Sequence, residues 1–412
     1  MKILFITKQI PFPPRSGYPI VVYNTIKGLL ALGAEISLFS LNPIRNNVEV
    51  DDIYDPVFKQ IKFYTQTVDN RVTALNALVN LFGKTSYNVS RFYTDEAAKK
   101  LEIILRENTF DVIQLESIFT VPYLSLIKQH SIAKVIYRAH NIEFLLWERL
   151  SGQPGFFLRR RYLSFLTQRL RAFETENINR FDYIFTISDP DRQNILRFGC
   201  EVPIAVFPVA LDLDNYVADR SKTSYPTLFH LGAMDWRPNQ EGLEWFLDDV
   251  WPDIEKLNKD LRFYIAGKNM QKHFFDYDSE NVIVEGEVFD AIDFMNSKAI
   301  MIVPLLSGTG MRVKIIEGMA MKKCIIATTI AAEGIKYING HDILIADTAD
   351  EFYRSILQCM INPQRWMEIG DNARQTVEKY HRIRPMCAEI MKIYSELNEN
   401  KSDNLINLSK LK

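Results

Sequence analysis

Short apolar runs rich in β-branched and aromatic residues alternate with longer amphipathic stretches along the chain. In the first half these runs are KILFIT (2–7), EISLFSL (35–41), DVIQLE (111–116), KVIYRA (134–139), DYIFTIS (182–188) and PIAVFP (203–208). Between them, stretches such as residues 20–32 have the periodicity of amphipathic helices. This alternation is typical of a parallel β-sheet whose strands are joined by crossover helices.

The same alternation restarts after residues 209–226. Its runs are TLFHLG (227–232), LRFYIAG (261–267), NVIVEG (281–286), AIMIVP (299–304), KCIIAT (323–328) and DILIA (342–346). We therefore predict two doubly wound α/β domains, 1–208 and 227–381, joined by a linker at 209–226. Ligands of such folds bind at the carboxyl ends of the strands, so the strand-to-helix loops are where function is expected.

The end of the chain predicts one further helix. Residues 382–398 are amphipathic and follow the final helix of the second domain, with a break at Arg384-Pro385, because proline disfavours a continued helix before it. We expect this helix to pack back on the first domain. Residues 399–412 are polar and are expected to form a frayed tail.

Composition fits a globular α/β protein of 412 residues, with 47% hydrophobic and 24% charged residues. The opening MKILFIT has no signal-peptide cleavage site, and no apolar run reaches the length of a bilayer span. The four cysteines are scattered without CxxC spacing, which favours reduced thiols in a cytoplasmic protein and disfavours structural zinc.

Charge is close to balanced, with a net value of -2. Residues 1–210 hold 25 basic and 20 acidic side chains, and residues 211–412 hold 24 and 31. The first half therefore favours an anionic surface or substrate, but its excess is too small for nucleic-acid binding. The pattern does not predict an oligomeric state.

The loop KQIPFPPRSGYP after the first strand lacks GxGxxG, which excludes a dinucleotide-binding fingerprint there. Gly17 lies at a helix start, where backbone N–H groups can approach an anionic ligand. A simple tight turn explains Gly17 equally well.

The stretch PLLSGTGMRVKIIEGMA (304–320) carries the strongest chemical signal. Gly308 and Gly310 flank Thr309, so consecutive N–H groups can form a nest for phosphate before the next helix. Arg312 and Lys314 add two positive charges, which suits a diphosphate.

Glu317 follows one turn later, and its carboxylate suits hydrogen bonds from paired ribose hydroxyls. Together these residues indicate a nucleotide diphosphate or a sugar nucleotide. The alternative is that Glu317 serves the helix dipole while Arg312 and Lys314 are solvated.

Several stretches resemble the C-terminal domain of glycosyltransferase family 4, whose members are retaining enzymes of the GT-B fold. They are LFHLGAMDWRPNQEGLEWFLDDVWPDI, LRFYIAG, VIVEGEV and IVPLLSGTGMRVKIIEGMAMKKCIIATTIAAEGI. PFPPRSGYPIVVYNTIKGLLALGAEISLFSL and YRAHNIE resemble its acceptor-side loop and its histidine loop. The resemblance reaches about residue 381. It implies two Rossmann-like domains facing a cleft, with a C-terminal helix crossing back to the N-terminal domain.

Carried over to this chain, the resemblance implies that Glu317 binds the donor ribose and that Arg312 and Lys314 act at the diphosphate. The backbone of Thr309, Gly310 and Met311 would lie beside the transferred sugar. Thr309 stands where the family often has a glutamate.

The loop GAMDWRPNQEG would contribute Gly232, Arg237 and Asn239 to donor binding. Many members carry Arg and Lys here, five residues apart, whereas this chain has no lysine in the loop. The diphosphate should therefore depend more on Arg312 and Lys314.

His140, in RAHNIE, is the third catalytic candidate, because its imidazole or carbonyl could reach the anomeric region of a sugar. The alternative is a helix-entry residue, with Asn141 as cap. His230 is interpreted as a core histidine. Arg15 and Gly17 are the acceptor-side candidates.

Asp-x-Asp pairs occur at 189–191, 212–214 and 276–278. We interpret all three as turn or cap residues, with Ser188 capping a helix. No metal site and no cofactor are expected, since Arg312, Lys314 and the helix start can neutralise the diphosphate.

These features predict a hexosyltransferase acting in bacterial polysaccharide or cell-envelope synthesis, with a nucleotide sugar as donor and a glycan or lipid-linked glycan as acceptor. Residues 155–173 carry five arginines, no acidic residue and interleaved aromatics, which suit anionic lipid at the inner membrane face or a solvated helix face equally. The alternatives are a nucleotide-sugar 2-epimerase and a non-catalytic GT-B protein that binds glycan or nucleotide.

Overall fold

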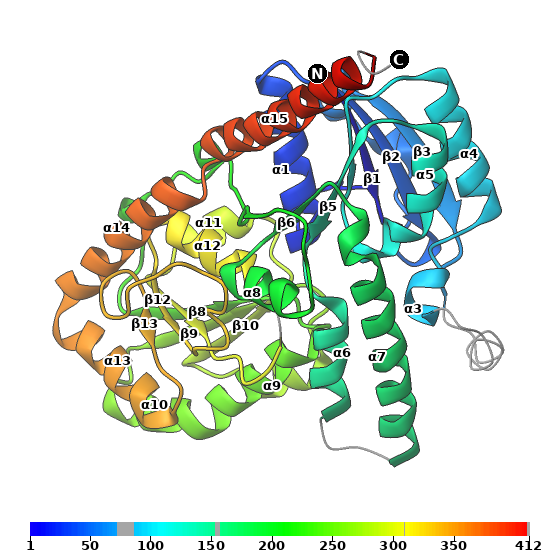
Figure 1. The fold of residues 1–412 in the computed structure, drawn as a ribbon. Helices are drawn as coiled ribbons and strands as arrows, with labels where there is room; N and C mark the ends of the chain where they lie inside the picture. The colour runs from blue at the N-terminus through cyan, green and yellow to red at the C-terminus, as the bar shows by residue number, and fades with distance from the viewer. Residues whose placement is uncertain (72–85, 153–156, 309, 410–412) are drawn as a thin grey trace. The chain divides into compact units, whose positions relative to one another are not determined.

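The computed structural model describes residues 1–71, 86–152, 157–308 and 310–409. The chain divides into two compact units, each built around one sheet (Figure 1). One unit comprises Met1–Pro208 together with Ile383–Lys412, and the other comprises Val209–Arg382.

The sheet of the first unit is parallel throughout its described strands. These are β1 (Lys2–Thr7), β2 (Glu35–Pro43), β3 (Lys62–Val68), β4 (Val112–Leu115), β5 (Lys134–Ala139), β6 (Tyr183–Thr186) and β7 (Ile204–Val206). Their order is β3-β2-β1-β4-β5-β6-β7, and Ile3 of β1 pairs with both Ile36 and Val112. The order therefore reverses between β1 and β4, which is where doubly wound sheets bind ligands.

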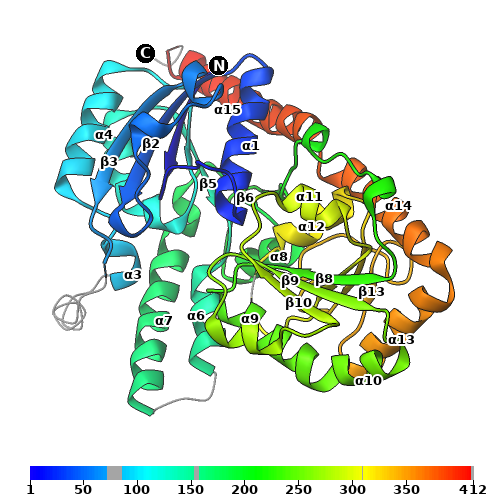
Figure 2. The same cartoon turned by 180° about the vertical axis from the view of Figure 1, so that it is seen from behind.

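Helices lie on both sides of this sheet (Figure 2). They are α1 (Gly17–Ala31), α3 (Tyr87–Ser90), α4 (Asp95–Glu107), α5 (Leu124–His130), α6 (Glu143–Gly152), α7 (Phe157–Asn177), α8 (Asp189–Arg197) and α15 (Ile383–Ser409). Helices α6 and α7 lie side by side and extend beyond the end of the sheet, and α15 packs on α1.

The second unit repeats the design. Its strands are β8 (Thr227–Leu231), β9 (Arg262–Ala266), β10 (Val282–Gly286), β11 (Ile300–Val303), β12 (Cys324–Ala327) and β13 (Leu344–Ile345), in the order β10-β9-β8-β11-β12-β13. Its helices are α9 (Arg237–Trp245), α10 (Trp251–Leu257), α11 (Ala291–Asn296), α12 (Val313–Ala320), α13 (Ala349–Ile361) and α14 (Pro363–Tyr380). The order reverses between β8 and β11.

The apolar runs form strands because both faces of each central strand are buried. Leu4 and Phe5 are consecutive in β1 and point to opposite faces, yet neither is exposed to solvent. Ile300 and Met301 of β11 repeat this pattern. The fold class predicted from the sequence, two parallel α/β domains, is confirmed.

Strand β3 was not predicted. It lies at the edge of its sheet, and its sequence KFYTQTV mixes half-buried aromatic and polar residues. The side chains of an edge strand are less completely buried than those of a central strand, so an edge strand needs no continuous apolar run. The pattern that identifies the other strands is therefore absent.

Residues 209–226 belong to the second unit and are not a separate linker. The N–H of Leu211 donates to the carbonyl of His381 at 2.7 Å, and the N–H of Asp219 donates to Oδ1 of Asn296 at 2.9 Å. These bonds attach the segment to helices of the second unit.

The last helix does return to the first unit, as predicted. It begins at Ile383 and continues to Ser409, past the predicted end at residue 398. Pro385 lies in its first turn. Backbone N–H groups in a first turn have no partner within the helix, so a proline there removes no helical hydrogen bond. In the described part of the chain, no helix combines the length and apolar character needed to cross a bilayer.

Gly28 allows α15 to approach α1 closely. A Cβ atom at this position would lie 2.4 Å from both Cys387 Sγ and Ile383 Cγ2. We expect Gly28→Ala to lower the free energy of unfolding, because overpacking of this kind costs about 1–3 kcal/mol. The steric cost outweighs the preference of helices for alanine over glycine, about 1 kcal/mol.

Urea denaturation followed by circular dichroism measures this effect. Adding Cys387→Ala to the same chain removes the Sγ atom and should recover part of the lost stability. A Gly28→Ala variant more stable than the parent protein would contradict the close contact.

Candidate functional site

The turn between β11 and α12 contains two glycines in the left-handed region of backbone conformation. Gly308 has φ +113° and Gly310 has φ +82°, values that favour glycine. A Cβ atom on Gly308 would also lie 2.7 Å from Arg312 Nη2 and 2.9 Å from Trp236 Cη2. The turn therefore requires glycine here for two separate reasons. Thr309 lies outside the described residues.

Arg312 is folded back on this turn. It is the N-cap residue of α12, and its Nη1 atom donates to the carbonyl of Gly310 at 2.5 Å. Its guanidinium carbon lies 4.7 Å from the centre of the Trp236 ring. Arg312 and the partly buried Met311 thus lie at the entrance of α12, beside the backbone that was predicted to bind a diphosphate.

Glu317 is buried in α12, with 6% of its surface exposed. The hydroxyl of Tyr216 donates to its Oε1 atom at 2.9 Å, and the ammonium of Lys314 lies 2.9 Å from Oε2. Burial and the nearby Glu317 carboxylate raise the pKa of Tyr216 well above its ordinary value, so this hydroxyl remains a donor. The carboxylate is therefore held from both oxygens.

Lys314 and Glu317 were predicted to bind different parts of one ligand, and the structure pairs them directly. Oε1 of Glu317 accepts the Tyr216 hydrogen bond, while Oε2 is paired with Lys314 by charge and accepts no hydrogen bond in the described structure, so the carboxylate has unused lone pairs. Glu317 can therefore accept from further hydroxyls while Lys314 remains beside it. The Lys314 side chain is about one-third exposed, so its ammonium has access to solvent and to an anion.

Gly232 and Asn239 form one packed loop after β8. A Cβ atom on Gly232 would lie 2.7 Å from Nδ2 of Asn239, which donates to the carbonyl of Ala233 at 2.9 Å. Arg237 points outward, with its side chain 70% exposed and paired with Glu241 at 2.6 Å. The loop thus holds Gly232 and Asn239 in place and leaves Arg237 at the surface.

His230 is a core histidine, as predicted. It is 1% exposed, its Nδ1 atom donates to the carbonyl of Ile302 at 3.0 Å, and burial lowers its pKa to about 4. Its Nε2 atom would lie 2.9 Å from a Cβ atom on Gly232. The imidazole is therefore neutral at pH 7 and packs against Gly232 at the start of the loop after β8.

In the first unit, a buried carboxylate and an imidazole meet where β4 and β5 end. Glu116 has no exposed surface, and its Oε2 atom lies 2.6 Å from Nε2 of His140. Burial alone would raise the pKa of Glu116. The hydrogen bonds from His140 and Gln114 and the charge of Arg138 oppose this and hold that pKa below its ordinary value. Glu116 is therefore ionised at neutral pH.

The pKa of His140 is lowered, mainly by burial, although Glu116 acts in the opposite direction. A neutral imidazole beside an ionised carboxylate carries its proton on Nε2. Its Nδ1 atom is then an acceptor, which is the state needed to receive a hydrogen bond from a sugar hydroxyl.

The side chains of Tyr18, Lys8 and Phe119 form a cluster beside His140. The Tyr18 ring centre lies 4.6 Å from that of His140, and the ammonium of Lys8 lies 4.6 Å from the Tyr18 ring and 5.0 Å from the Phe119 ring. Burial lowers the pKa of Lys8, while the charge of Glu143 acts to raise it. This cluster places one ammonium group near His140.

The two acceptor-side candidates differ in position. Gly17 is the first residue of α1 and precedes Tyr18, which contacts His140. Arg15 is exposed, and its backbone N–H donates to the carbonyl of Pro13 at 2.8 Å. The structure thus brings Tyr18 against His140 and leaves Arg15 at the surface.

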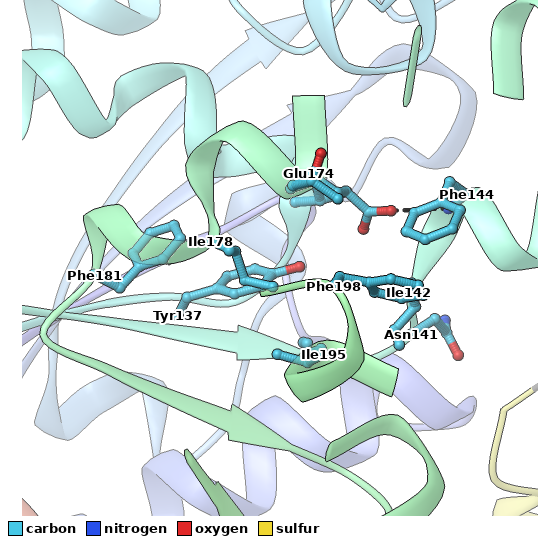
Figure 3. Close-up of a pocket in the computed structure, with 12 residues that line it drawn as sticks. Tyr137, Asn141, Ile142, Phe144, Glu174, Ile178, Phe181, Ile195 and Phe198 are labelled. Carbon is cyan, nitrogen blue, oxygen red and sulfur yellow. Dashed lines mark hydrogen bonds between the residues drawn. The ribbon is translucent and has the colours of Figure 1, made fainter. Parts of the chain in front are cut away.

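A small apolar cavity lies elsewhere in the first unit (Figure 3). It is lined by Ile118, Tyr137, Ala139, Asn141, Ile142, Phe144, Glu174, Thr175, Ile178, Phe181, Ile195 and Phe198. Its volume of about 20 Å³ has room for one or two waters. Burial raises the pKa of Glu174 to about 8, although the N–H groups of Phe144 and Glu143 donate to its carboxylate. The cavity is too small for a sugar.

The first Asp-x-Asp pair lies at the start of α8, and Ser188 caps that helix by accepting from the N–H of Asp191 at 3.2 Å, as predicted. Among the described residues, no group of three or more His, Cys, Asp or Glu side chains gathers in the manner of a metal site.

Sequence reasoning missed Lys8, Glu116, Tyr18 and Tyr216. Lys8 and Glu116 directly follow β1 and β4, so their position at the ends of neighbouring strands was a usable signal. Tyr18 follows the glycine that was identified. Tyr216 is 101 residues from its partner Glu317 and offered no local signal.

Comparison with known proteins agrees with this geometry. The family described as Glycosyltransferase Family 4 matches residues 15–215, and the family described as Glycosyl transferases group 1 matches residues 225–362. An uncharacterized 44.6 kDa protein in the cps region of Klebsiella pneumoniae is 20% identical over 405 residues, which cover 95% of this chain and 99% of that protein.

Solved structures show the same fold at low identity. Sucrose-phosphate synthase from Thermosynechococcus elongatus has a TM-score of 0.71 at 13% identity, covering 96% of this chain and 99% of that one. Anabaena HepE in complex with UDP and glucose has a TM-score of 0.64 at 13% identity, covering 96% and 100%. With both halves matched by glycosyltransferase families, the chain belongs to the glycosyltransferases of the GT-B fold.

Proposed function

We propose that the protein is a retaining hexosyltransferase that moves a sugar from a nucleoside-diphosphate sugar to a hydroxyl of a glycan or lipid-linked glycan. The observation that carries the proposal is the buried Glu317 carboxylate, held by Tyr216 and Lys314 in the helix that follows the glycine turn at Gly308 and Gly310. The relative from a cps region favours a role in polysaccharide synthesis of the cell envelope.

We propose the following roles from the chemistry of the residues together with the family resemblance. Glu317 accepts hydrogen bonds from the ribose hydroxyls, and the glycine turn binds the diphosphate with Arg312 and Lys314. Gly232, Arg237 and Asn239 line the donor loop, and Thr309 to Met311 lie beside the sugar. His140 accepts from a sugar hydroxyl, and the loop with Arg15 and Gly17 serves the acceptor.

In the reaction the bond between the anomeric carbon and the diphosphate breaks, and a bond from the acceptor oxygen to that carbon forms on the same face. The acceptor proton passes to the departing phosphate oxygen. Stabilising the charge on the leaving diphosphate is the main contribution of the protein, and the cations and N–H groups provide it without a metal ion or cofactor.

Nucleotide binding tests the donor site first. We expect UDP to raise the unfolding temperature, because a ligand of the native state adds about 2.7 kcal/mol at 100 times its Kd. Glu317→Ala should weaken UDP binding by roughly 10- to 100-fold, since hydrogen bonds to charged groups contribute about 1.5–3 kcal/mol. Isothermal titration calorimetry measures the change, and GDP and ADP test the base.

Glu244→Ala is the matched control, because Glu244 pairs with the exposed His273 at 2.8 Å. Equal UDP affinity of the Glu317→Ala and Glu244→Ala proteins would reject the ribose role. Tight UDP binding without any turnover would favour a non-catalytic protein.

Product analysis tests the reaction. With UDP-glucose as donor and octyl glycosides as acceptors, we expect UDP release that depends on acceptor and an α-configured product by proton NMR. An inverted product would contradict retention and would make His140, backed by Glu116, a general base. Interconverted free nucleotide sugar would instead identify an isomerase.

We also propose that the basic helix α7 contacts anionic lipid at the cytoplasmic membrane face. Its exposed Arg160 and Arg161 supply charge, while Arg169 packs on the Phe165 ring at 4.1 Å. We expect the protein to sediment with phosphatidylglycerol vesicles at low salt and to be released at about 0.5 M salt, where exposed charges are screened. Arg160→Glu with Arg161→Glu should abolish sedimentation. Absence of binding at low salt would reject this contact.

A further inference from the structure

A buried chain of hydrogen bonds connects the last helix to His140. The hydroxyl of Tyr394 in α15 donates to Oε1 of Gln114, and Nε2 of Gln114 donates to Oε1 of Glu116. The other oxygen of Glu116 receives His140 Nε2 at 2.6 Å. Tyr394, Gln114 and Glu116 have no exposed surface, so water does not supply alternative partners.

The charge of Glu116 determines which group donates in each of these hydrogen bonds. Glu116 is ionised and can only accept, so the Gln114 amide must present its NH₂ group to it. The amide oxygen then faces Tyr394, whose hydroxyl must donate. Because each buried polar group has one suitable orientation, a change at Tyr394 affects the orientation of Gln114 and the charge compensation of Glu116.

Tyr394 is held firmly in this position. Its ring stacks on Phe185 of β6 at 6.1 Å, and the same helix places Cys387 Sγ 3.7 Å from the carbonyl of Thr25 in α1. Arg138 donates to Thr25 Oγ1 at 2.7 Å and brings a buried positive charge near Glu116. The helix at the end of the chain thus contributes a polar group to the centre of the first unit.

We propose that Tyr394 is a positioning residue for His140: by helping Gln114 compensate the Glu116 charge, it keeps the imidazole in its neutral form, with Nδ1 ready to accept a sugar hydroxyl. The inference rests on the proposed function in that it assigns His140 to sugar binding. It explains why the chain continues past the second sheet and returns to the first, since Tyr394 completes a network that β4 and β5 leave open.

Other charged and titratable groups also face this network, and two of them, Lys8 and Arg138, act directly to lower the pKa of His140. The groups are Lys8 after β1, Tyr18 of α1, Arg138 of β5, Glu143 of α6 and Cys387 of α15. Since none of them changes in a Tyr394→Phe protein, a difference between that protein and the parent reports on the missing hydroxyl.

The test is the pH titration of His140 by imidazole ¹H–¹⁵N NMR on the full chain, assigned with a His140→Gln protein. We expect the parent to show the proton on Nε2. Without the Tyr394 hydroxyl, Gln114 donates less well and leaves more of the Glu116 charge uncompensated, which favours protonated His140. Tyr394→Phe should therefore raise the pKa of His140 by roughly half a unit.

Gln114→Leu removes the middle of the chain and should raise the pKa at least as much. If Tyr394 acts through Gln114, Tyr394→Phe should add no further shift in the Gln114→Leu protein. This second variant also keeps the test informative if the first folds poorly. The matched control is Tyr123→Phe, which deletes an equally buried hydroxyl that donates to the carbonyl of Phe92 at 2.9 Å.

An unchanged His140 titration in Tyr394→Phe would overturn the proposal. So would a shift equal to that of Tyr123→Phe, or one that adds fully to the Gln114→Leu shift. The titration uses no nucleotide or sugar, so its outcome is separate from the function. A parent protein that fails to bind UDP would reject the donor site and leave the hydrogen-bond chain intact.

Discussion

Each unit of this protein buries a carboxylate near the carboxyl edge of its parallel sheet, and the free-energy cost of burying that charge must be offset by the groups around it. Glu116 has no exposed surface and Glu317 has 6%. An unpaired buried charge is costly, so each must be surrounded by donors and cations. Around Glu317 these are Tyr216 and Lys314, and around Glu116 they are His140 and Gln114, with Arg138 nearby. The groups around Glu116 hold its pKa below the ordinary value, and both carboxylates lie where doubly wound sheets bind ligands.

Both carboxylates depend on tyrosines that arrive from distant segments. Tyr216 lies in the stretch that connects the sheets, and Tyr394 lies in the helix that follows the second sheet. A tyrosine hydroxyl donates without adding charge. Tyr216 donates to Glu317 directly, whereas Tyr394 donates to Gln114, which in turn donates to Glu116. The connecting stretch therefore supplies Tyr216 to one candidate site, and the last helix supplies Tyr394 to the other.

The sequence predicts the strands and the position of the loops because a parallel strand buried on both faces must be apolar, and because ligands meet the strand ends. A local glycine turn also marks Glu317 as a candidate, whereas His140 became a candidate through the family resemblance of RAHNIE. Strand β3 escaped prediction because an edge strand keeps a mixed pattern. Tyr216 and Tyr394 escaped because their partners are 101 and 280 residues away, and no local pattern encodes a contact made by tertiary folding. The ion pair between Lys314 and Glu317 also escaped prediction. The spacing placed both residues on one helix but did not indicate which group each side chain would face.

The central claim is that Glu317 recognises the ribose of the donor nucleotide. Calorimetric comparison of UDP with 2′-deoxy-UDP, on the parent protein and on Glu317→Gln, tests it most directly. If the carboxylate accepts from the ribose hydroxyls, the parent should bind 2′-deoxy-UDP roughly tenfold more weakly than UDP, and Glu317→Gln should lose most of that difference. An equal preference for UDP in both proteins would contradict the claim, because the hydroxyl would then be recognised by another group.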